Sequence, residues 1–289
     1  MSDAATAFEP HRRYLVGLAY RMLGSVAEAE DIVQDAFLRW QARGDDVVAA
    51  PRAFLSRIVT RLCLDRLKSA RAQREHYVGT WLPEPVIESA APRADEAIGL
   101  ADDLSVALLV TLERLSPLER AAFLLHDVFE MEFDAVADVL ERSEAAVRQL
   151  AARARDHVRD ERPRFTASSD AASRLADAFH RATVQGDLAA ISQLLAEDAV
   201  FYSDGGGKRR AALNPIYGRD KILRFIAGIA AKGRGVTDPS AIRRATINGL
   251  PGFVVHGPEG VETLALEISG EHIVAVYAIR NPDKLRHVE

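Results

Sequence analysis

The segment Leu115–Val158 constrains the fold most, because it carries the signals of a helix-turn-helix with its helix caps in place. Ser116 is placed to cap a first helix, Pro117 suits the first helical position, and Glu119 completes a capping box. A second, short helix is predicted at Phe133–Leu140.

A third helix follows, with Ser143 placed as its N-cap. Its apolar residues recur at helical spacing: Val147, Leu150, Ala151, Ala154 and Val158. Four polar residues lie off this stripe: Glu144, Arg148, Gln149 and Arg153. A helix of this kind can present Arg and Gln to base edges in a DNA major groove. The alternative is a three-helix packing unit with a solvated outer face.

Length and composition predict an ordinary globular protein of two or three domains in 289 residues. We find no apolar run long enough to span a membrane and no signal peptide, so we expect a cytoplasmic chain with no membrane partner. The single cysteine, Cys63, excludes an internal disulfide. It lies between two leucines, which predicts a small buried hydrophobic residue rather than a redox switch.

Charge is distributed unevenly, although the net charge of −5 is not that of a typical DNA-binding protein. Arg52–Arg74 holds seven basic residues against one acid, and Arg142–Arg164 holds seven against four. Between them, Glu84–Asp103 carries six acids and one Arg. Two basic helical segments therefore flank an acidic connector.

The pattern along the chain predicts four parts. Residues 8–76 form an all-helical domain, 77–105 a linker, 106–162 the helix-turn-helix domain, and 171–289 a domain of another style. The linker contains Trp81-Leu-Pro-Glu-Pro85, which cannot continue a helix because each proline also restricts the residue before it.

In the first domain, Ala27–Trp40 is predicted to be a helix with one apolar stripe and an acidic outer face. The outer face includes Glu30, Asp31, Gln34 and Asp35. Pro51 begins another helix, for which we expect Leu55, Ile58, Val59 and Leu62 to be buried. The basic residues occupy the opposite side of that helix.

The last domain is predicted to be α+β. Its expected helices are Ser173–Thr183, Leu188–Leu195 and Arg219–Ala231. Its expected strands are Ala199–Tyr202, Ala245–Asn248, Phe253–His256, Glu262–Ile268 and Ile273–Ala278. Turn residues at Pro258–Gly260 and Ser269–Glu271 separate the last three strands.

Three motifs, in order and spacing, resemble a bacterial sigma factor of the extracytoplasmic-function (ECF) group. Ala27–Trp40 is similar to region 2.2 of that family, Pro51–Glu75 to regions 2.3 and 2.4, and Leu115–Arg159 to region 4. The last domain resembles a SnoaL-like domain, with the ketosteroid-isomerase (NTF2-like) fold. The resemblance thus implies two all-α sigma domains followed by an α+β SnoaL-like domain.

Short motifs resemble the subgroup with such a fused domain, the sigma J type. They are Trp81-Leu-Pro-Glu-Pro85, Asp204-Gly-Gly-Gly-Lys208 and Asn281-Pro-Asp-Lys-Leu285. We expect a regulatory clasp formed by Trp81, Pro83, Asp204, Gly205, Gly206, Gly207, Lys208, Asn281, Pro282, Asp283 and Lys284. Through it, the C-terminal domain would modulate the DNA-binding domains in cis, helped by its high effective concentration.

The resemblance also implies partners, namely core RNA polymerase and promoter DNA. Glu30, Asp31, Gln34 and Asp35 are the candidate contacts to the polymerase β′ clamp region. Candidate −10 contacts are Arg57, Arg61, Asp65, Lys68 and Arg71, and the basic residues among them supply the positive charge that single-stranded DNA requires. Candidate −35 contacts are Glu144, Arg148, Gln149 and Arg153.

Two positions depart from the family pattern. Arg61 stands where an Asn often lies four residues before the Asp of region 2.4, here Asp65. Glu141 stands in the helix-turn-helix turn where the family usually has Gly. A non-Gly residue in a left-handed conformation costs about 1 kcal/mol, so we expect this turn to be shaped differently.

The C-terminal domain offers His180, Tyr202, Asp204 and His256 as candidates to line a pocket for a small ligand. The histidines show no metal-ligand spacing, and Gly205–Lys208 departs from a phosphate-binding loop because Arg209 replaces Ser or Thr. We therefore predict no metal, no cofactor and no enzyme activity, since a fold alone does not argue for catalysis. Two alternatives stay open at this point: a DNA-binding regulator independent of polymerase, and a ligand-sensing or enzymatic domain tethered to a DNA-binding module.

Overall fold

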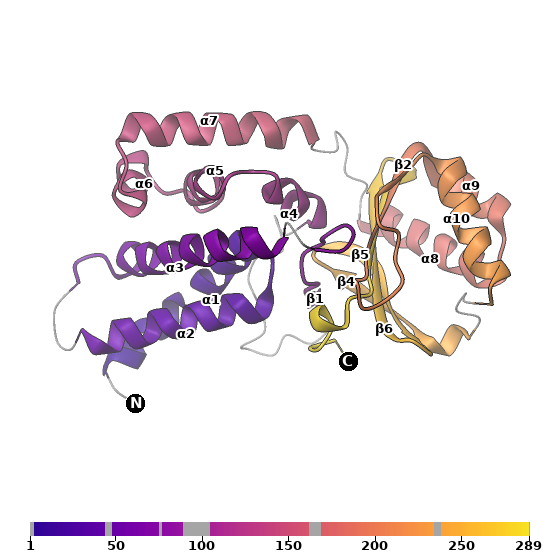
Figure 1. Cartoon of the computed structure of the whole chain (residues 1–289), viewed down its shortest axis with the longest axis horizontal. Helices are drawn as coiled ribbons and strands as arrows, with labels where there is room; N and C mark the ends of the chain where they lie inside the picture. Colours follow the sequence, from indigo (N-terminus) through magenta and orange to yellow (C-terminus); the bar gives the residue numbers. More distant parts are fainter. Residues whose placement is uncertain are drawn as a thin grey trace. The chain divides into compact units, whose positions relative to one another are not determined.

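The computed structural model describes residues 3–43, 48–74, 77–88, 105–161, 169–233 and 238–288. The chain divides into two compact units (Figure 1). Unit 1 comprises Met1–His76 and Pro92–Arg162, and unit 2 comprises Tyr77–Ala91 and Pro163–Glu289. The described part of the predicted linker, residues 77–88, therefore belongs to unit 2.

Unit 1 is built from helices and their connecting turns over its described residues. They are α1 (Asp3–Leu23), α2 (Val26–Ala42), α3 (Pro51–Arg74), α4 (Val106–Glu113), α5 (Pro117–Phe123), the π-helix η1 (Leu124–Val128), α6 (Phe133–Leu140) and α7 (Glu144–Glu161). The all-helical prediction is confirmed.

The core of unit 1 follows the helical stripes. On α2 the buried residues are Ala29, Ile32, Val33, Ala36 and Trp40, as predicted. On α3 the buried line runs at every fourth residue through Leu55, Val59, Cys63 and Leu67. Ile58 and Leu62 were expected to be buried with them, but they lie at the side of this line and are only partly covered. Burial raises the pKa of the Cys63 thiol well above its ordinary value, as expected of an inert core residue.

Helices α1–α3 and α4–α7 pack together within unit 1. Arg120 on α5 is 3% exposed, and its guanidinium donates to the Met22 carbonyl at the end of α1 over 2.6 Å and to Glu113 on α4 over 2.7 Å. The ring of Tyr14 on α1 meets Phe129 edge-on, with centroids 4.9 Å apart. Apolar and charged contacts together therefore join the two helical parts.

The helix-turn-helix carries the predicted caps. The Ser116 hydroxyl accepts from the Glu119 amide and the Glu119 side chain accepts from the Ser116 amide, so the capping box is complete. The Ser143 hydroxyl accepts from the Ala146 amide over 3.3 Å and caps α7. The expectation of a differently shaped turn is wrong, because Glu141 itself adopts the left-handed conformation (φ 54°, ψ 49°) that glycine favours.

Unit 2 contains the predicted helices and strands together with two further short strands. Its helices are α8 (Ser169–Gln185), α9 (Leu188–Leu194) and α10 (Arg219–Ala231), with short 3-10 turns at Pro239–Ala241 and Pro282–Lys284. Its strands are β1 (Ile87–Glu88), β2 (Leu195–Asp204), β3 (Ile216–Tyr217), β4 (Ile242–Ile247), β5 (Leu250–Gly257), β6 (Gly260–Ser269) and β7 (His272–Ile279).

The strands form one sheet in the order β1-β4-β5-β6-β7-β2-β3. All neighbours are antiparallel except β2 and β7, which run parallel. The edge strand β1 comes from the linker, with Ile87 opposite Ile247 of β4. A segment predicted to be a connector is thus a strand of the C-terminal sheet.

Helices α8, α9 and α10 cover one face of this sheet (Figure 1). The core between them holds Phe179, Ile191, Leu195, Ile222, Phe253, Val255, Leu266 and Val276. Strand alternation sends every second residue to the other face, which decides where the candidate site residues lie. The predicted α+β arrangement is confirmed.

We expect Leu266→Ala to destabilise unit 2 by about 2–5 kcal/mol, since it empties a fully buried position. Leu213→Ala is the matched control, because Leu213 is 63% exposed and the same substitution should leave stability nearly unchanged. Denaturant unfolding in a Trp40→Phe background checks this, since Trp81 in unit 2 is then the one remaining tryptophan. Equal losses for both variants would contradict the assigned core.

Candidate functional site

The outer face of α2 is acidic and open to solvent. Glu30, Asp31, Gln34 and Asp35 are all exposed, while the opposite stripe of the helix is buried. Ser25 caps the helix by accepting from the Glu28 amide over 3.2 Å. The structure therefore presents the four predicted residues together as one charged helix face.

The exposed face of α3 is basic. Arg57, Arg61, Asp65 and Lys68 are exposed, as predicted, and Lys68 pairs with Asp65 over 3.0 Å. The side chain of Arg71 lies outside the described residues. Exposed guanidinium and ammonium groups on one helix face can neutralise the phosphates of a DNA strand.

A carboxylate of the helix-turn-helix lies on this basic face. Glu141 Oε1 is 3.1 Å from Arg57 Nη2 and also accepts from Arg61 Nη2. Hydrogen bonds from Arg61 and Arg57 hold the pKa of Glu141 below its ordinary value. The turn residue that departs from the family pattern thus pairs with two of the predicted −10 contacts.

The polar side chains of α7, the predicted recognition helix, differ in their contacts. Arg148 donates to Glu144 over 3.0 Å, and its guanidinium lies 4.2 Å from the centre of the Phe133 ring. Gln149 is exposed. Arg153 instead turns toward α5 and donates to Glu119 over 2.8 Å.

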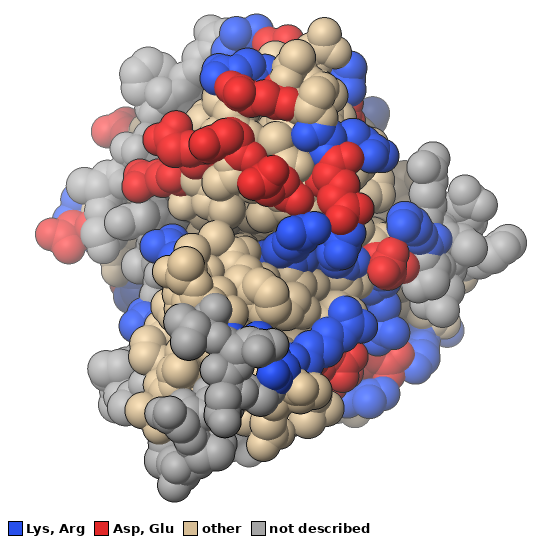
Figure 2. All heavy atoms as spheres, turned by 90° about the vertical axis from the view of Figure 1, so that its left-hand side faces the viewer, with Lys and Arg blue, Asp and Glu red and all other residues tan. Residues whose placement is uncertain are grey.

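Glu119 therefore serves both the helix cap and this ion pair. Burial raises the pKa of Glu119, but hydrogen bonds from Ser116 and Arg153 outweigh it and hold the pKa below its ordinary value. In the view of Figure 2, a band of acidic side chains crosses unit 1 with basic side chains directly beside it. Each described cation among the predicted DNA contacts has an acidic partner.

In unit 2, Asp204 at the end of β2 has no exposed surface and anchors two distant segments. Its Oδ1 accepts from the Tyr77 hydroxyl over 2.6 Å and the Gly206 amide over 3.0 Å. Its Oδ2 accepts from the Leu82 amide over 2.9 Å and from Lys284 Nζ over 2.7 Å. One buried carboxylate thus joins the linker, the glycine loop and the C-terminal tail.

The tail packs on the linker around this carboxylate. The Lys284 ammonium lies 4.2 Å from the centre of the Trp81 ring and also donates to the Leu82 carbonyl. Asn281 Nδ2 donates to the Tyr77 hydroxyl over 2.9 Å. Burial and the hydrogen bond to Asp204 raise the pKa of Tyr77 above its ordinary value.

Other contacts join the same three segments around Asp204. Lys208 of the glycine loop pairs with Asp283 of the tail. His287 lies 2.7 Å from the Pro85 carbonyl oxygen through Nε2 and 3.1 Å from Glu84 through Nδ1. Pro83 is buried in the linker, and Pro282 opens the short 3-10 turn of the tail. We call the contacts of Asp204, Lys284 and their linker partners the linker anchor.

The glycines of the loop allow the chain to approach this closely. Gly206 has φ 58°, and a Cβ there would lie 2.2 Å from Asn281 Nδ2. A Cβ on Gly205 would lie 2.1 Å from the Arg209 carbonyl oxygen. Gly207 is the third glycine of the same turn, which ends at Lys208. Glycine is the residue that such a turn requires.

The structure does not gather His180, Tyr202 and His256 into one pocket, so that expectation needs correction. His180 lies on the helix side of the sheet, with its ring centre 5.1 Å from that of Phe253. Tyr202 faces the other side and stacks on Tyr277 at 5.1 Å. His256 is exposed on β5. Strand alternation turns Tyr202 and His256 away from the helices, because their neighbours Phe201 and Val255 take the helix-side positions.

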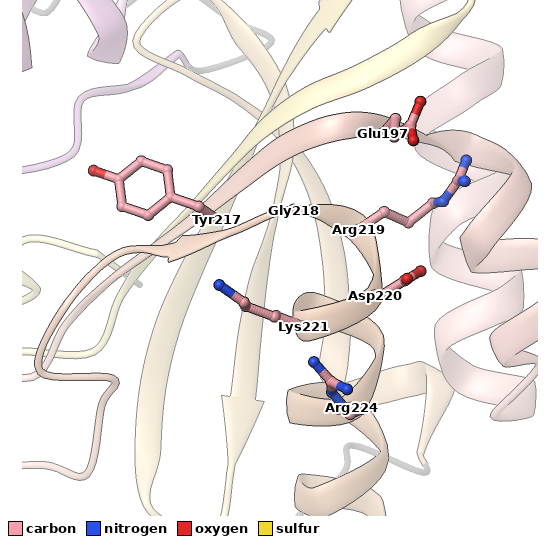
Figure 3. Close-up of a pocket in the computed structure, with 7 residues that line it drawn as sticks. All are labelled: Glu197, Tyr217, Gly218, Arg219, Asp220, Lys221 and Arg224. Atoms are coloured by element: carbon pink, nitrogen blue, oxygen red, sulfur yellow. The ribbon is translucent and has the colours of Figure 1, made fainter.

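A pocket does lie elsewhere, at the N-terminal end of α10 (Figure 3). Its lining residues are Glu197, Tyr217, Gly218, Arg219, Asp220, Lys221 and Arg224. Arg219 extends toward Glu197 in Figure 3, so part of its positive charge faces an acid. Among the described residues, no cluster of His, Cys, Asp and Glu could hold a metal ion. No described helix has the length and apolar character needed to cross a membrane.

Sequence reasoning missed several partners of Asp204 and the tail. Tyr77 and the Leu82 amide bind the carboxylate, and His287 adds a contact near the end of the chain. A backbone amide leaves no mark in a sequence. The aromatic residue at position 77, in an otherwise polar stretch, was the one available signal.

We expect Asp204→Asn to destabilise unit 2 by about 3–5 kcal/mol, because it leaves the largely buried Lys284 ammonium without its counter-ion. Asp283→Asn is the matched control, since Asp283 is exposed and its ion pairs are worth less than about 1 kcal/mol. Urea unfolding followed by Trp81 fluorescence in the Trp40→Phe background measures both. A loss for Asp204→Asn no larger than for the control would contradict the linker anchor.

Comparison with known proteins finds similar proteins for both units of the chain. The model "Sigma-70 region 2" matches residues 7–73, and "Sigma-70, region 4" matches residues 105–158. The chain is 41% identical to the ECF RNA polymerase sigma factor SigJ of Mycobacterium tuberculosis, over 96% of this chain and 91% of that protein. It is 36% identical to a probable ECF sigma factor, SigI, of the same species, over 66% of each chain.

The crystal structure of SigJ from M. tuberculosis superposes with a TM-score of 0.82 at 39% identity, covering 98% of both chains. The likeness thus extends over the α+β unit as well as the helical unit. The exposed acidic face of α2, the basic face of α3 and the capped helix-turn-helix lie in the two matched regions. The chain belongs to the ECF sigma factors of RNA polymerase.

Proposed function

We propose that three surfaces of unit 1 each bind a different partner of this sigma factor. The α2 face (Glu30, Asp31, Gln34 and Asp35) binds the β′ clamp region of core RNA polymerase. The α3 face (Arg57, Arg61, Asp65, Lys68 and Arg71) binds the −10 region of promoter DNA. The exposed residues of α7 (Glu144, Arg148, Gln149 and Arg153) read the −35 region.

The acidic face of α2 supports the first assignment. It presents three carboxylates and one amide on a single exposed side of a well-capped helix. Such a face repels DNA phosphates and complements a basic protein surface. A DNA-binding regulator that works without polymerase has no need of this face.

The second and third assignments rest on charge and position. The α3 face offers Arg57, Arg61 and Lys68 to a DNA backbone, which is the general requirement for holding a strand. On α7, Arg148 is already oriented by Glu144 and the Phe133 ring, and a fixed guanidinium suits bidentate base recognition. Arg153 must leave Glu119 to take part.

We further propose that unit 2 modulates transcription in cis through the linker. The carrying observation is that Asp204 binds the linker at Tyr77 and Leu82 and the tail at Lys284. Residues 77–88 connect the two DNA-binding parts of unit 1 along the chain, yet they fold as part of unit 2. A change in the tail therefore alters the segment that tethers region 2 to region 4.

We expect Asp35→Lys to slow association with purified core polymerase by about tenfold at low salt, because a carboxylate on the proposed docking face becomes a cation. The deficit should shrink as salt screens the charges. Glu271→Lys is the control, since it makes the same charge change on an exposed turn of unit 2. Surface plasmon resonance gives the rates, and identical rates for both variants would exclude this face.

We expect Lys284→Ala to change the amount of transcript without changing which promoters are used, because it breaks the linker anchor and leaves the DNA-binding surfaces intact. Arg286→Ala is the matched control, since Arg286 is an exposed tail cation with an ion pair to Asp283. Run-off transcription with core polymerase on a pooled promoter library, read by sequencing, reports both quantities. Removal of residues 281–289 should act like Lys284→Ala.

Three results would count against these proposals. No transcript from the wild-type chain on a library that includes the cognate promoter would contradict the sigma-factor assignment of the surfaces. Unaltered output from both Lys284→Ala and the tail truncation would exclude modulation through the anchor. A change in promoter choice would place the tail in promoter recognition instead.

A further inference from the structure

A single carboxylate from the helix-turn-helix turn occupies two arginines of the −10 helix. Glu141 Oε1 accepts from Arg57 Nη2 over 3.1 Å and from Arg61 Nη2. The three side chains are 54%, 45% and 47% exposed, so the pairing is open to water and to a competing anion. A DNA phosphate carries the same charge and would seek the same guanidinium groups.

The contact belongs to a closed arrangement of unit 1. Helix α3 packs on α5 and α6, Arg120 is buried between the two helical parts, and Tyr14 lies against Phe129. Glu141 lies at the open edge of this interface, beside solvent. It is therefore placed to bridge the two parts without being a member of the core.

This closed arrangement does not fit a promoter-bound chain. Elements at −10 and −35 lie about 25 base pairs apart, which is about 85 Å of B-DNA. Arg61 touches Glu141, and the recognition helix begins at Glu144, at most about 11 Å further along the chain. One body of this size cannot reach both elements, so the two parts must separate before the promoter is bound.

We propose that Glu141 is an intramolecular latch, which holds Arg57 and Arg61 in the free chain and releases them when the −10 helix binds DNA. The proposal rests on the assignment of Arg57 and Arg61 as DNA contacts under the proposed function. It also accounts for a non-glycine residue in a left-handed turn, because glycine would fit that backbone better but has no carboxylate to offer.

The test measures how tightly the free, full-length chain binds a fluorescein-labelled oligothymidylate, by fluorescence anisotropy at low salt. Glu141→Gln should tighten binding by about threefold to tenfold, because it raises the fraction of chains with free arginines. Glu141→Gly removes the carboxylate and relieves the backbone, so it must give the same gain. Asp138→Asn, an exposed carboxylate of α6 in the same motif, should leave affinity unchanged.

The source of the gain is checked by adding Arg57→Ala and Arg61→Ala to Glu141→Gln, which should abolish it. The latch is overturned if Glu141→Gln binds like the wild type, or if the gain persists without the two arginines. A further experiment distinguishes the −10 assignment from the latch. The same two arginines are replaced in the otherwise wild-type chain, and transcription is assayed with core polymerase. Unchanged promoter transcription there overturns the −10 assignment and the latch with it, whereas reduced transcription with no gain from Glu141→Gln overturns the latch alone.

Discussion

The arrangement of unit 2 depends on one buried negative charge. Asp204 has no exposed surface, and an isolated carboxylate in such a place would be costly. Three hydrogen-bond donors and one ammonium group satisfy it, and they come from three segments far apart in the sequence. The linker, the glycine loop and the tail therefore hold their positions together. The loss of any one leaves the others around an unsatisfied charge.

Unit 1 depends on weaker and more exposed electrostatics. Its helices pack through apolar stripes, while its functional side chains are paired with acids at the surface: Arg148 with Glu144, Arg153 with Glu119, and Arg61 with Glu141. Half-exposed ion pairs contribute little to stability and exchange easily. Buried pairing in unit 2 suits an anchor, whereas exposed pairing in unit 1 suits surfaces that must exchange one partner for another.

Local rules predicted the parts of the fold that depend on neighbouring residues. The capping box at Ser116 and the stripe on α2 follow from spacing alone, and both are present. The two-residue strands β1 and β3 were not predicted, because each is defined by its partner strand and carries no sequence pattern of its own. The shape of the Glu141 turn was mispredicted because backbone preference favours Gly, while Arg57 and Arg61 lie far away in the sequence.

The candidate site in unit 2 was likewise predicted only in part. The three motifs of the linker, the glycine loop and the tail were expected to act together, and the structure brings them to one carboxylate. The pocket residues were chosen by chemical type, and period-two alternation along β2 turns Tyr202 away from the face that α8 and His180 cover. Alternation along β2 predicts that Tyr202 and Phe201 face opposite sides of the sheet, but which side the helices cover is seen only in the structure.

The linker anchor also has a consequence for synthesis of the chain. Lys284 and Asn281 lie about 200 residues after their linker partners, so the anchor cannot close until the ribosome has translated that intervening stretch. At about 5–20 residues per second, this delay is about 10–40 s. Region 2 has been translated before that interval and region 4 is translated within it, and throughout it the segment between them has no C-terminal partner. A nascent sigma factor of this kind therefore passes through a period in which its own regulatory contacts do not yet exist.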